Sequence, residues 1–275
     1  MQRLADRLRS TGKRIGVVPT MGYLHEGHLS LIRIAKKNAD IVITTDFVNP
    51  TQFAPQEDFS TYPRDLPRDA RLAEGAGSDV LFTPDTHAMY PENYLTFLDV
   101  EQIADVLEGK ARPAHFRGVV TVVAKLFNIT KPHVAVFGQK DAQQAILVKQ
   151  MVRDLNFDID VIIGPIVRES DGLAMSSRNV YLSSSERADA TVLFQSLISA
   201  EESIRKGERQ CGNIIKQMHD VISARYTAHV EYVSIADSLT LREYSQLNPG
   251  MHVLVSLAVR VGRTRLIDNI LVSVP

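Results

Sequence analysis

The sequence predicts an α/β protein in which a parallel sheet, covered by helices on both faces, precedes a smaller α+β unit. Two observations lead to this prediction. Up to Ile163, short apolar runs alternate with helix-like segments, which is typical of parallel strands joined by helical crossovers. After Gly164 the periodicity changes, because two amphipathic helical segments are followed by runs in which apolar and polar residues alternate.

The first part of the chain contains five predicted strands. Each is a short apolar run that ends at a glycine, a proline or a polar turn. In parallel sheets ligands bind beyond the carboxyl ends of the strands, so we expect functional residues in the loops that follow strands. The strands are expected over residues 15–18, 41–47, 80–82, 134–137 and 160–163, and the helices over 29–37, 66–76, 119–130 and 141–156.

The second part of the chain is predicted to contain two helices and three strands. The sequence SSSE, which begins at Ser183, is a capping box and predicts one continuous helix with an apolar face that reaches Ile204. A second helix carries Met218 on its apolar face. Strands are expected over residues 230–235, 251–261 and 266–274, with Gly262 in the turn between the last two.

Composition indicates an ordinary globular protein with small partners. The chain has 275 residues, of which 44% are hydrophobic, and its 31 Lys+Arg against 32 Asp+Glu give a net charge of −1. This balance speaks against a nucleic-acid partner. Cys211 is the only cysteine, so a disulfide within the chain is excluded. Neither a long apolar run nor an export signal is recognisable, so we expect a cytoplasmic protein without a membrane partner.

The most informative segment is PTMGYLHEGHLSL, which directly follows the first predicted strand. His25 and His28 flank Gly27 at the start of the following helix. A helix N-terminus attracts anions, and imidazoles donate hydrogen bonds to phosphoryl oxygens. A purely capping role for two histidines is the alternative, which the position after the first strand disfavours. A zinc site of the HExxH type is disfavoured as well, because here the histidines are three residues apart rather than four.

Two further segments place polar side chains after strands. In FGQKDAQQ, Gly138 leaves room for a ligand, Lys140 supplies a positive charge and Gln144 follows one helical turn later. In FVNPTQF, Asn49 and Gln52 offer two more amides. Because an amide both donates and accepts hydrogen bonds, these side chains suit a hydroxy acid.

The segment AMSSRN, residues 174–179, combines two hydroxyl groups with a guanidinium group. Ser176, Ser177 and Arg178 can together close on a triphosphate. Taken alone, such a triplet is an ordinary solvated loop. In a chain that also carries His25 and His28, it is similar to the phosphate-gripping loop of nucleotidyltransferases.

These segments, in this order and together with YPRD, MYP, LEGKARPAHFRG and TRLIDN, resemble the pantoate–β-alanine ligase (pantothenate synthetase) family of the HIGH-motif nucleotidyltransferase superfamily. The resemblance covers almost the whole chain. It implies a Rossmann-like domain over residues 1–167 that binds nucleotide and pantoate, and an α+β lid domain over residues 168–275 that carries the MSSRN loop. It also implies ATP-dependent condensation of pantoate with β-alanine through pantoyl adenylate, with Mg²⁺ accompanying ATP, and a homodimer.

The resemblance implies a role for individual residues. His28 is the expected proton donor, and His25, Lys140 and Arg178 are expected to act with it on the phosphates. Gln52 and Gln144 would orient pantoate. The expected ATP contacts are Met21, His25, Gly27, His28, Gly138, Gln139, Lys140, Asp141, Val167 (through its backbone), Met175, Ser176, Ser177 and Arg178.

Other positions are less determined by the family pattern. Asn49 and Tyr62 are candidates for binding β-alanine, whereas Arg112 and His115 either bind a carboxylate or stabilise their own loop. For Mg²⁺, Asp69 is the expected ligand and Asp141 the alternative.

Three residues depart from the family pattern. Gln139 replaces a glutamate, Ala142 replaces a tyrosine, and Asp46 stands where an apolar residue is usual. A carboxylate at that strand end repels a phosphate unless it is paired.

Two other functions remain open for the chain. One is that of another HxGH nucleotidyltransferase, such as a pantetheine-phosphate adenylyltransferase-like enzyme, and the other is that of a scaffold protein that has lost the chemistry.

Overall fold

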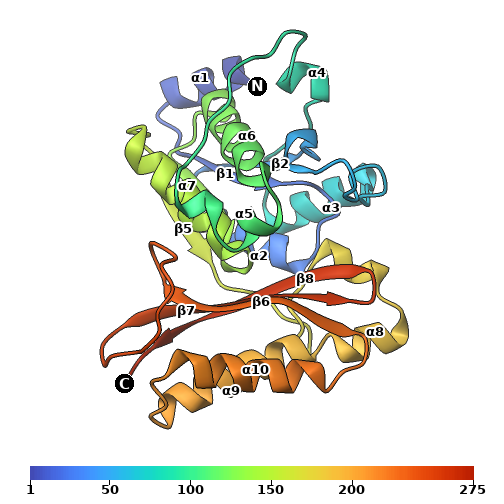
Figure 1. Cartoon of the computed structure of the whole chain (residues 1–275). Helices are drawn as coiled ribbons and strands as arrows, with labels where there is room; N and C mark the ends of the chain where they lie inside the picture. The colour runs from blue at the N-terminus through green and yellow to red at the C-terminus, as the bar shows by residue number, and fades with distance from the viewer. The chain divides into compact units, whose positions relative to one another are not determined.

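The computed structural model describes all 275 residues and divides them into two compact units (Figure 1). The first unit comprises Met1–Gln139 and Gln143–Pro165, and the second comprises Lys140–Ala142 and Ile166–Pro275. The first contains a five-stranded parallel sheet and the second a three-stranded antiparallel sheet, which confirms the predicted fold class. No helix combines the length and the apolar character needed to span a bilayer.

The five predicted strands of the first unit are confirmed. They form one parallel sheet in the order β3-β2-β1-β4-β5. The chain moves from β1 outward to β2 and β3 and then returns to β4 on the other side of β1, so the loops after β1 and β4 leave the sheet at its switch point. The strands are β1 (Ile15–Thr20), β2 (Ile41–Asp46), β3 (Val80–Phe82), β4 (Val134–Gly138) and β5 (Asp160–Gly164).

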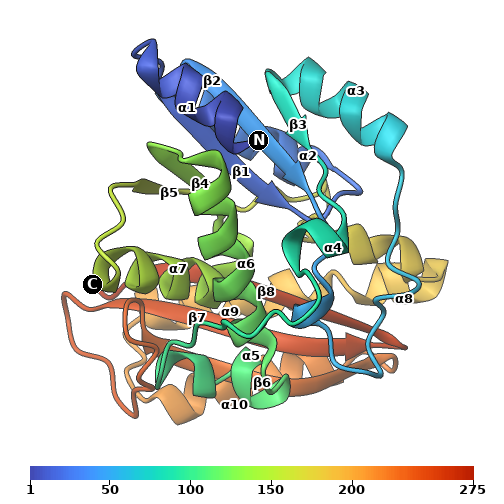
Figure 2. The same cartoon turned by 90° about the horizontal axis from the view of Figure 1, so that it is seen from above.

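Helices cover both faces of this sheet, as its apolar strands require (Figure 2). One apolar cluster joins Ala5, Phe127 and Leu147 against one face, and another joins Ile32 and Ala73 against the other. The helices of the first cluster are α1 (Gln2–Ser10), α6 (His115–Thr130) and α7 (Ala142–Asp154), and those of the second are α2 (Glu26–Asn38) and α3 (Leu66–Ala76).

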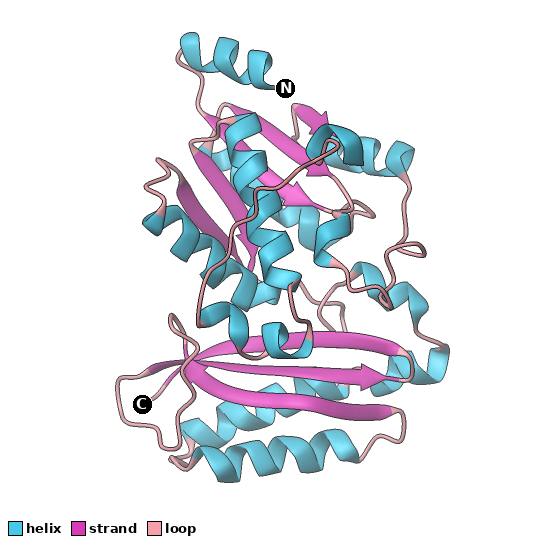
Figure 3. Cartoon of the chain, turned by 45° about the horizontal axis from the view of Figure 1, so that its top comes forward, coloured by secondary structure: helices cyan, strands magenta, loops and turns pink.

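Long loops with short helical turns connect these elements (Figure 3). The sequence pattern did not predict the short turns, nor α1, whose buried Ala5 packs in the cluster of α6. It also placed the starts of α2 and α6 too late, since they begin at Glu26 and His115. The short elements are η1 (Pro50–Gln52), α4 (Thr86–Met89), η2 (Ile103–Asp105), α5 (Glu108–Ala111) and η3 (Gln139–Asp141).

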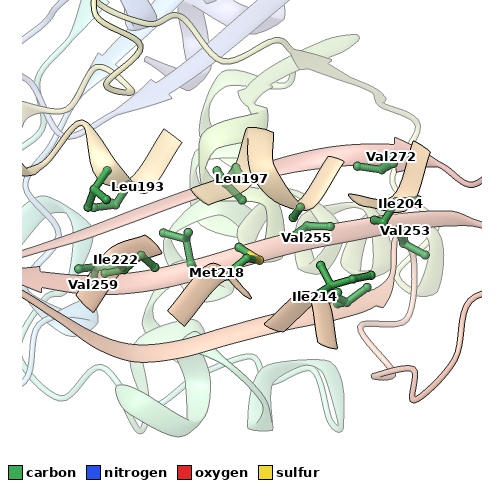
Figure 4. Packing of buried hydrophobic residues seen from close by; sticks show 14 of the residues in the cluster. Leu193, Leu197, Ile204, Ile214, Met218, Ile222, Val253, Val255, Val259 and Val272 are labelled. Carbon is green, nitrogen blue, oxygen red and sulfur yellow. The ribbon is translucent and has the colours of Figure 1, made fainter. Parts of the chain in front are cut away.

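The second unit packs two helices on one face of its antiparallel sheet. In Figure 4, Leu197 from α9, Met218 from α10 and Val255 from β7 point into one apolar interior. All three are fully buried. The strands are β6 (Ala228–Asp237), β7 (His252–Val261) and β8 (Thr264–Ser273), and the helical elements are η4 (Ser177–Tyr181), α8 (Ser184–Asp189), α9 (Val192–Arg205) and α10 (Cys211–Ser223).

The prediction of one continuous helix from Ser183 is wrong, because α8 ends at Asp189 and α9 begins at Val192. The predicted capping box is present, with the Glu186 carboxylate accepting from the Ser183 N–H at 2.8 Å. The break lies at Thr191, whose hydroxyl donates to the Ala188 carbonyl at 2.8 Å. That carbonyl would accept from Val192 in a continuous helix, so the threonine competes with the helical hydrogen bond.

Candidate active site

The two histidines of the HxGH segment lie together at the start of α2. His25 is the N-cap residue, and its N–H donates to Nδ1 of His28 at 3.4 Å. The two rings stack with their centroids 4.0 Å apart. Because Nδ1 of His28 accepts this hydrogen bond, the neutral ring carries its proton on Nε2. The structure thus brings both predicted imidazoles to the helix N-terminus that follows β1.

Asp69 of α3 holds the turn that precedes His25. Its Oδ2 accepts from the Tyr23 N–H at 2.6 Å, and its Oδ1 accepts from the Leu24 N–H at 2.7 Å. Tyr23 has a left-handed backbone, with φ of 49°, so the turn depends on such support. The Asp69 side chain is 0% exposed, and no group of three or more potential metal ligands occurs in the chain. Both oxygens of this buried carboxylate accept backbone N–H groups, so the geometry supports a role of Asp69 in holding the turn, and its expected metal role stays a prediction.

Asn49 is buried and its amide is fully occupied by the protein. Its Nδ2 donates to Gln52 Oε1 at 3.0 Å and to the Gly118 carbonyl at 3.2 Å, while its Oδ1 accepts from the Tyr90 hydroxyl at 2.8 Å. Gln52 Nε2 in turn points at Met21 Sδ, 3.1 Å away. The structure therefore supports a role of Asn49 in orienting Gln52. Gln52 joins the segment after β2 to the segment after β1.

The other predicted substrate residues of the first unit have different settings. Tyr62 is buried, with its ring edge-on to Phe53 at 5.9 Å between centroids, so the structure places it in a packed aromatic cluster. Gln144 lies half-buried in the first turn of α7. Arg112 and His115 contact Glu57 and the backbone of Gln52. Of the two roles that the sequence left open for them, the structure supports stabilisation of the loop.

Asp46 ends β2 beside the turn that contains Gly22. A Cβ atom on Gly22 would lie 2.3 Å from Asp46 Oδ1, and Gly22 has a positive φ of 77°, so a glycine is required there. Burial and the nearby Asp69 raise the pKa of Asp46 to about 6, against an opposing effect of Arg64. Asp46 is thus a carboxyl group that titrates close to neutral pH.

In the second unit the backbone brings Val167 and the serine-arginine segment together. The Met175 N–H donates to the Val167 carbonyl at 3.0 Å. Ser176 is the N-cap of η4, and its hydroxyl accepts from the Arg178 N–H at 3.2 Å. Asn179 closes the segment, because its Nδ2 donates to the Ala174 carbonyl at 3.2 Å. Four consecutive predicted ATP contacts, residues 175–178, therefore form one braced loop.

The segment 175–178 belongs to a longer loop, residues 166–179. This loop is held by ion pairs that no sequence motif predicted. Arg168 pairs with Asp268 at 2.6 Å, donates to the Gly172 carbonyl at 3.0 Å and lies 4.0 Å over the Phe194 ring. Burial raises the pKa of Asp268, while Arg168 opposes that rise. The available signal was an aspartate within the apolar alternation of TRLIDN, since a buried carboxylate needs a cationic partner.

Arg187 makes a second set of ion pairs with the same loop. It contacts Glu169 at 2.6 Å and Asp171 at 2.7 Å, and Glu169 also accepts from Asn179 Nδ2 at 3.0 Å. No motif identifies Arg187, because its role depends on how α8 packs beside the loop.

The turn after β4 contains the remaining predicted residues. Lys140 and Asp141 group with the second unit, and the Asn269 side chain donates to the Lys140 carbonyl at 2.9 Å. Lys140 Nζ lies 3.9 Å from Asp141 Oδ1. A Cβ atom on Gly138 would meet only Leu31, at 3.7 Å, so packing within the protein does not require a glycine there. The space beside Gly138 is compatible with the predicted approach of a ligand, which stays a prediction.

Each unit therefore assembles its own part of the predicted site. The first pairs His25 with His28 and Met21 with Gln52, and the second brings together Val167 and residues 175–178. That the two parts bind one nucleotide stays a prediction.

Comparison with known proteins identifies the relatives of this chain. The model of the pantoate–beta-alanine ligase family matches residues 1–271. The pantothenate synthetase of Roseiflexus castenholzii is 58% identical, with 93% of this chain and 91% of the relative covered, and that of Acetivibrio thermocellus is 54% identical, with 97% and 94% covered.

Solved structures agree with these relatives. The pantothenate synthetase of Thermus thermophilus is 43% identical with a TM-score of 0.90, and the alignment covers 97% of this chain and 96% of that one. The pantoate–β-alanine ligase of Francisella tularensis, solved in complex with beta-gamma ATP and β-alanine, is 36% identical with a TM-score of 0.79, covering 98% and 95%.

Proposed function

Because the chain belongs to the pantoate–β-alanine ligase family, we propose that it condenses pantoate with β-alanine, using ATP, to form pantothenate. Pantoyl adenylate is the intermediate, pyrophosphate leaves in the first step and AMP in the second. The observation that carries this proposal is the family match over residues 1–271 in a chain that keeps His25, His28, Lys140 and the Ser176–Arg178 triplet.

In the first step a pantoate carboxylate oxygen forms a bond to the α-phosphorus of ATP, and the bond to the bridging oxygen of pyrophosphate breaks. A carboxyl group has a reference pKa of about 4, so pantoate is ionised at pH 7 and needs no base. The task of the protein is to position the reactants and to neutralise charge. His28, through its Nε2 proton, with His25, Lys140 and Arg178 are the proposed groups.

Pantoate is proposed to lie against the amides of Gln52 and Gln144. The Gln52 Nε2 group is directed at the sulfur of Met21, which is a weak acceptor. A carboxylate or hydroxyl oxygen of pantoate is a stronger acceptor and would replace the sulfur at little cost. Asn49 contributes by holding Gln52, which revises its expected role as a direct ligand of β-alanine.

In the second step the β-alanine nitrogen attacks the carbonyl carbon of pantoyl adenylate, and the bond to the AMP oxygen breaks. The amine has a pKa near 10 and must first lose a proton. One proton leaves before attack and a second leaves the nitrogen as the amide forms, with solvent and the departing phosphate as the acceptors. Tyr62 is buried among aromatic rings, which supports a role in shaping the site.

The residues of the second unit are proposed to close over ATP as a lid. The Val167 backbone would contact the adenine, while Met175, Ser176, Ser177 and Arg178 would bind the triphosphate. The bracing of this loop by Asn179 supports a common action of these residues. Gly27, Gly138, Gln139 and Asp141 are the remaining proposed ATP contacts.

Mg²⁺ is proposed to enter as the complex with ATP, bound mainly by phosphate oxygens and water. The burial of Asp69 leaves Asp141, whose side chain is 49% exposed, as the better candidate among the two carboxylates. We further propose a homodimer in the cytoplasm, by analogy with the family.

The test is exchange of labelled pyrophosphate into ATP by the purified chain. Exchange should require pantoate and should not require β-alanine, because pyrophosphate leaves in the first step. His28→Ala should lower the exchange rate by about 10²–10⁴ while the fold is kept, and His219→Ala, on the exposed side of α10, serves as the matched control. Exchange that proceeds with pantetheine phosphate instead would favour the adenylyltransferase alternative, and no exchange with either would favour the scaffold alternative.

A further inference from the structure

The backbone carbonyl of Gln52 receives two donors from a neighbouring segment. His115 Nδ1 lies 2.8 Å from this oxygen, and Arg112 Nη2 lies 3.3 Å from it. His115 begins α6, and Arg112 immediately follows α5. Gln52 is the last residue of η1, so no further helical turn donates a hydrogen bond to its carbonyl. The carbonyl oxygen is held by these two side chains instead.

Arg112 is itself fixed by a carboxylate. Its Nε and Nη2 donate to the two carboxylate oxygens of Glu57 at 2.7 and 2.6 Å, the bidentate geometry that Arg forms best. Its Nη1 lies 3.1 Å from His115 Nε2. Because a guanidinium group only donates, His115 Nε2 must accept and Nδ1 must carry the proton. The contacts therefore select a neutral ring in a single tautomer.

The environment of His115 keeps it neutral. Burial and the Arg112 charge lower the pKa of His115 to about 4, whereas the Gln52 carbonyl, Glu108 and Glu57 act in the opposite direction. Ion pairing with Arg112 also lowers the pKa of Glu57, against burial. The network therefore consists of one cation, one anion and one neutral donor, and its net charge is zero at neutral pH.

The start of α6 also contacts the segment that contains Gln52 through its backbone. The Gly118 carbonyl accepts from Asn49 Nδ2 at 3.2 Å. A Cβ atom on Gly118 would lie only 2.3 Å from the Thr51 carbonyl oxygen, so the two backbones pack directly on each other. Gln52 is thus fixed through its backbone from α6 and through its side-chain oxygen by Asn49, which leaves Nε2 with a defined direction toward Met21.

We propose that His115 and Arg112 are positioning residues that hold the Gln52 amide in the orientation that binds pantoate. This inference rests on the proposed function, because it takes Gln52 as a pantoate ligand. The two residues touch no substrate. They act on the affinity for pantoate through one backbone carbonyl, and Gln52 is already ordered before the substrate arrives.

The test compares the pantoate KM with the ATP KM in three variants. His115→Leu removes the donor to Gln52 and should raise the pantoate KM about tenfold, with the ATP KM within about twofold of the wild type. His115→Asn places an amide N–H near the position of Nδ1 and should recover most of that loss. Arg112→Lys keeps the charge without the planar fork and should raise the pantoate KM by about threefold to tenfold.

Arg265→Gln is the matched control, because it breaks an ion pair of similar exposure in the second unit. The side chains of Arg265 and Glu231 are 19% and 26% exposed, against 15% and 21% for Arg112 and Glu57. This control should leave both KM values unchanged. Thermal unfolding of every variant shows whether the fold is kept.

The outcomes separate this inference from the function on which it rests. A wild-type chain that forms no pantothenate contradicts the proposed function. If the wild-type chain is active, two results for His115→Leu overturn the positioning role alone. One is an unchanged pantoate KM, and the other is a pantoate KM that rises together with the ATP KM. If His115→Leu does not fold, Arg112→Lys decides, and an unchanged pantoate KM in that variant overturns the proposal.

Discussion

The turn before α2 and the loop of residues 166–179 are held by different kinds of interaction. The turn is held by the fully buried carboxylate of Asp69, which accepts hydrogen bonds from two backbone N–H groups. The loop is held largely by ion pairs. One is the largely buried pair of Arg168 with Asp268, whose side chains are 17% and 1% exposed, and another is the pair of Arg187 with Glu169, whose side chains are 27% and 33% exposed. Buried hydrogen bonds to a charged group are strong, whereas exposed ion pairs contribute little.

This difference matches the roles proposed for the two regions. A turn that presents imidazoles to a reacting phosphate has to be pre-organised before the substrate binds. Within the loop the Arg168–Asp268 pair is the anchor, whereas the more exposed pairs of Arg187 can exchange as the loop adjusts to ATP. We therefore expect substitutions at the turn to cost more activity and more stability than substitutions at the loop.

Asp69→Asn should have the largest effect of the substitutions that follow. The amide NH₂ group cannot accept, so one of the N–H groups of Tyr23 and Leu24 loses its partner. The free energy of unfolding should fall by about 1–3 kcal/mol, and the displaced turn should lower kcat/KM by about 100-fold. Urea unfolding and steady-state rates measure both. Asp65 is the N-cap of the same helix, and its Oδ1 accepts from the Arg68 N–H at 3.1 Å. Asp65→Asn should be nearly neutral because Asn is an equally good cap, and equal effects of the two substitutions would refute the role of Asp69.

A paired glycine comparison separates binding from packing. Gly138 and Gly164 are neighbours in register on β4 and β5. A Cβ atom on Gly164 would lie 2.4 Å from Leu31, whereas on Gly138 it would lie 3.7 Å from the same side chain. Gly164→Ala should cost about 1–3 kcal/mol of stability. Gly138→Ala should be stable but raise the ATP KM about tenfold, and an unchanged ATP KM would mean that no ligand approaches Gly138.

Arg187→Gln should have a modest effect on the loop of the second unit. It removes two partly exposed ion pairs, so the ATP KM should rise by about twofold to fivefold in dilute salt. In about 0.5 M KCl the difference from the wild type should shrink, because salt already screens the pairs. Arg205→Gln, which breaks the exposed pair with Glu201, is the control. A difference that persists in high salt would show that Arg187 acts through packing rather than charge.

Asp46→Asn should change mainly the pH dependence of stability. The pKa of Asp46 is about 6 in the folded chain and close to 4 in an unfolded one. The neutral Asp46 carboxyl group therefore makes its full contribution to the free energy of unfolding below about pH 4. This contribution is lost as the pH rises through 6. Asp46→Asn should melt at the same temperature as the wild type at pH 4 and at a higher temperature at pH 8. A difference in melting temperature that does not vary with pH would contradict this account.

The sequence predicted the parallel sheet well because its strands are buried on both faces. Such strands appear as continuous apolar runs, and all five occur where the runs predicted them. The sequence failed at α1, which depends on distant partners, and at the break between α8 and α9. The apolar residues of α1 pack in the cluster of α6, and the break at Thr191 follows from one side-chain hydrogen bond that no periodicity reveals.

For the site, local motifs predicted the segments but not the roles of all their residues. His25 and His28 are neighbours in sequence, so their contact at a helix start is a local property. Asp69 and Asn49 looked like ligands because their residue types bind cations and polar substrates. Their burial and their hydrogen bonds to Leu24 and Gly118 arise from tertiary packing, so their supporting roles became visible only in the structure.

The most direct measurement of the central claim is a crystal structure of this chain with a non-hydrolysable ATP analogue and pantoate. The account predicts one triphosphate in contact with both His28 and Arg178, with the Gln52 amide bound to pantoate. A triphosphate that contacts only one of these two side chains, with the other far from any phosphate, would contradict the account.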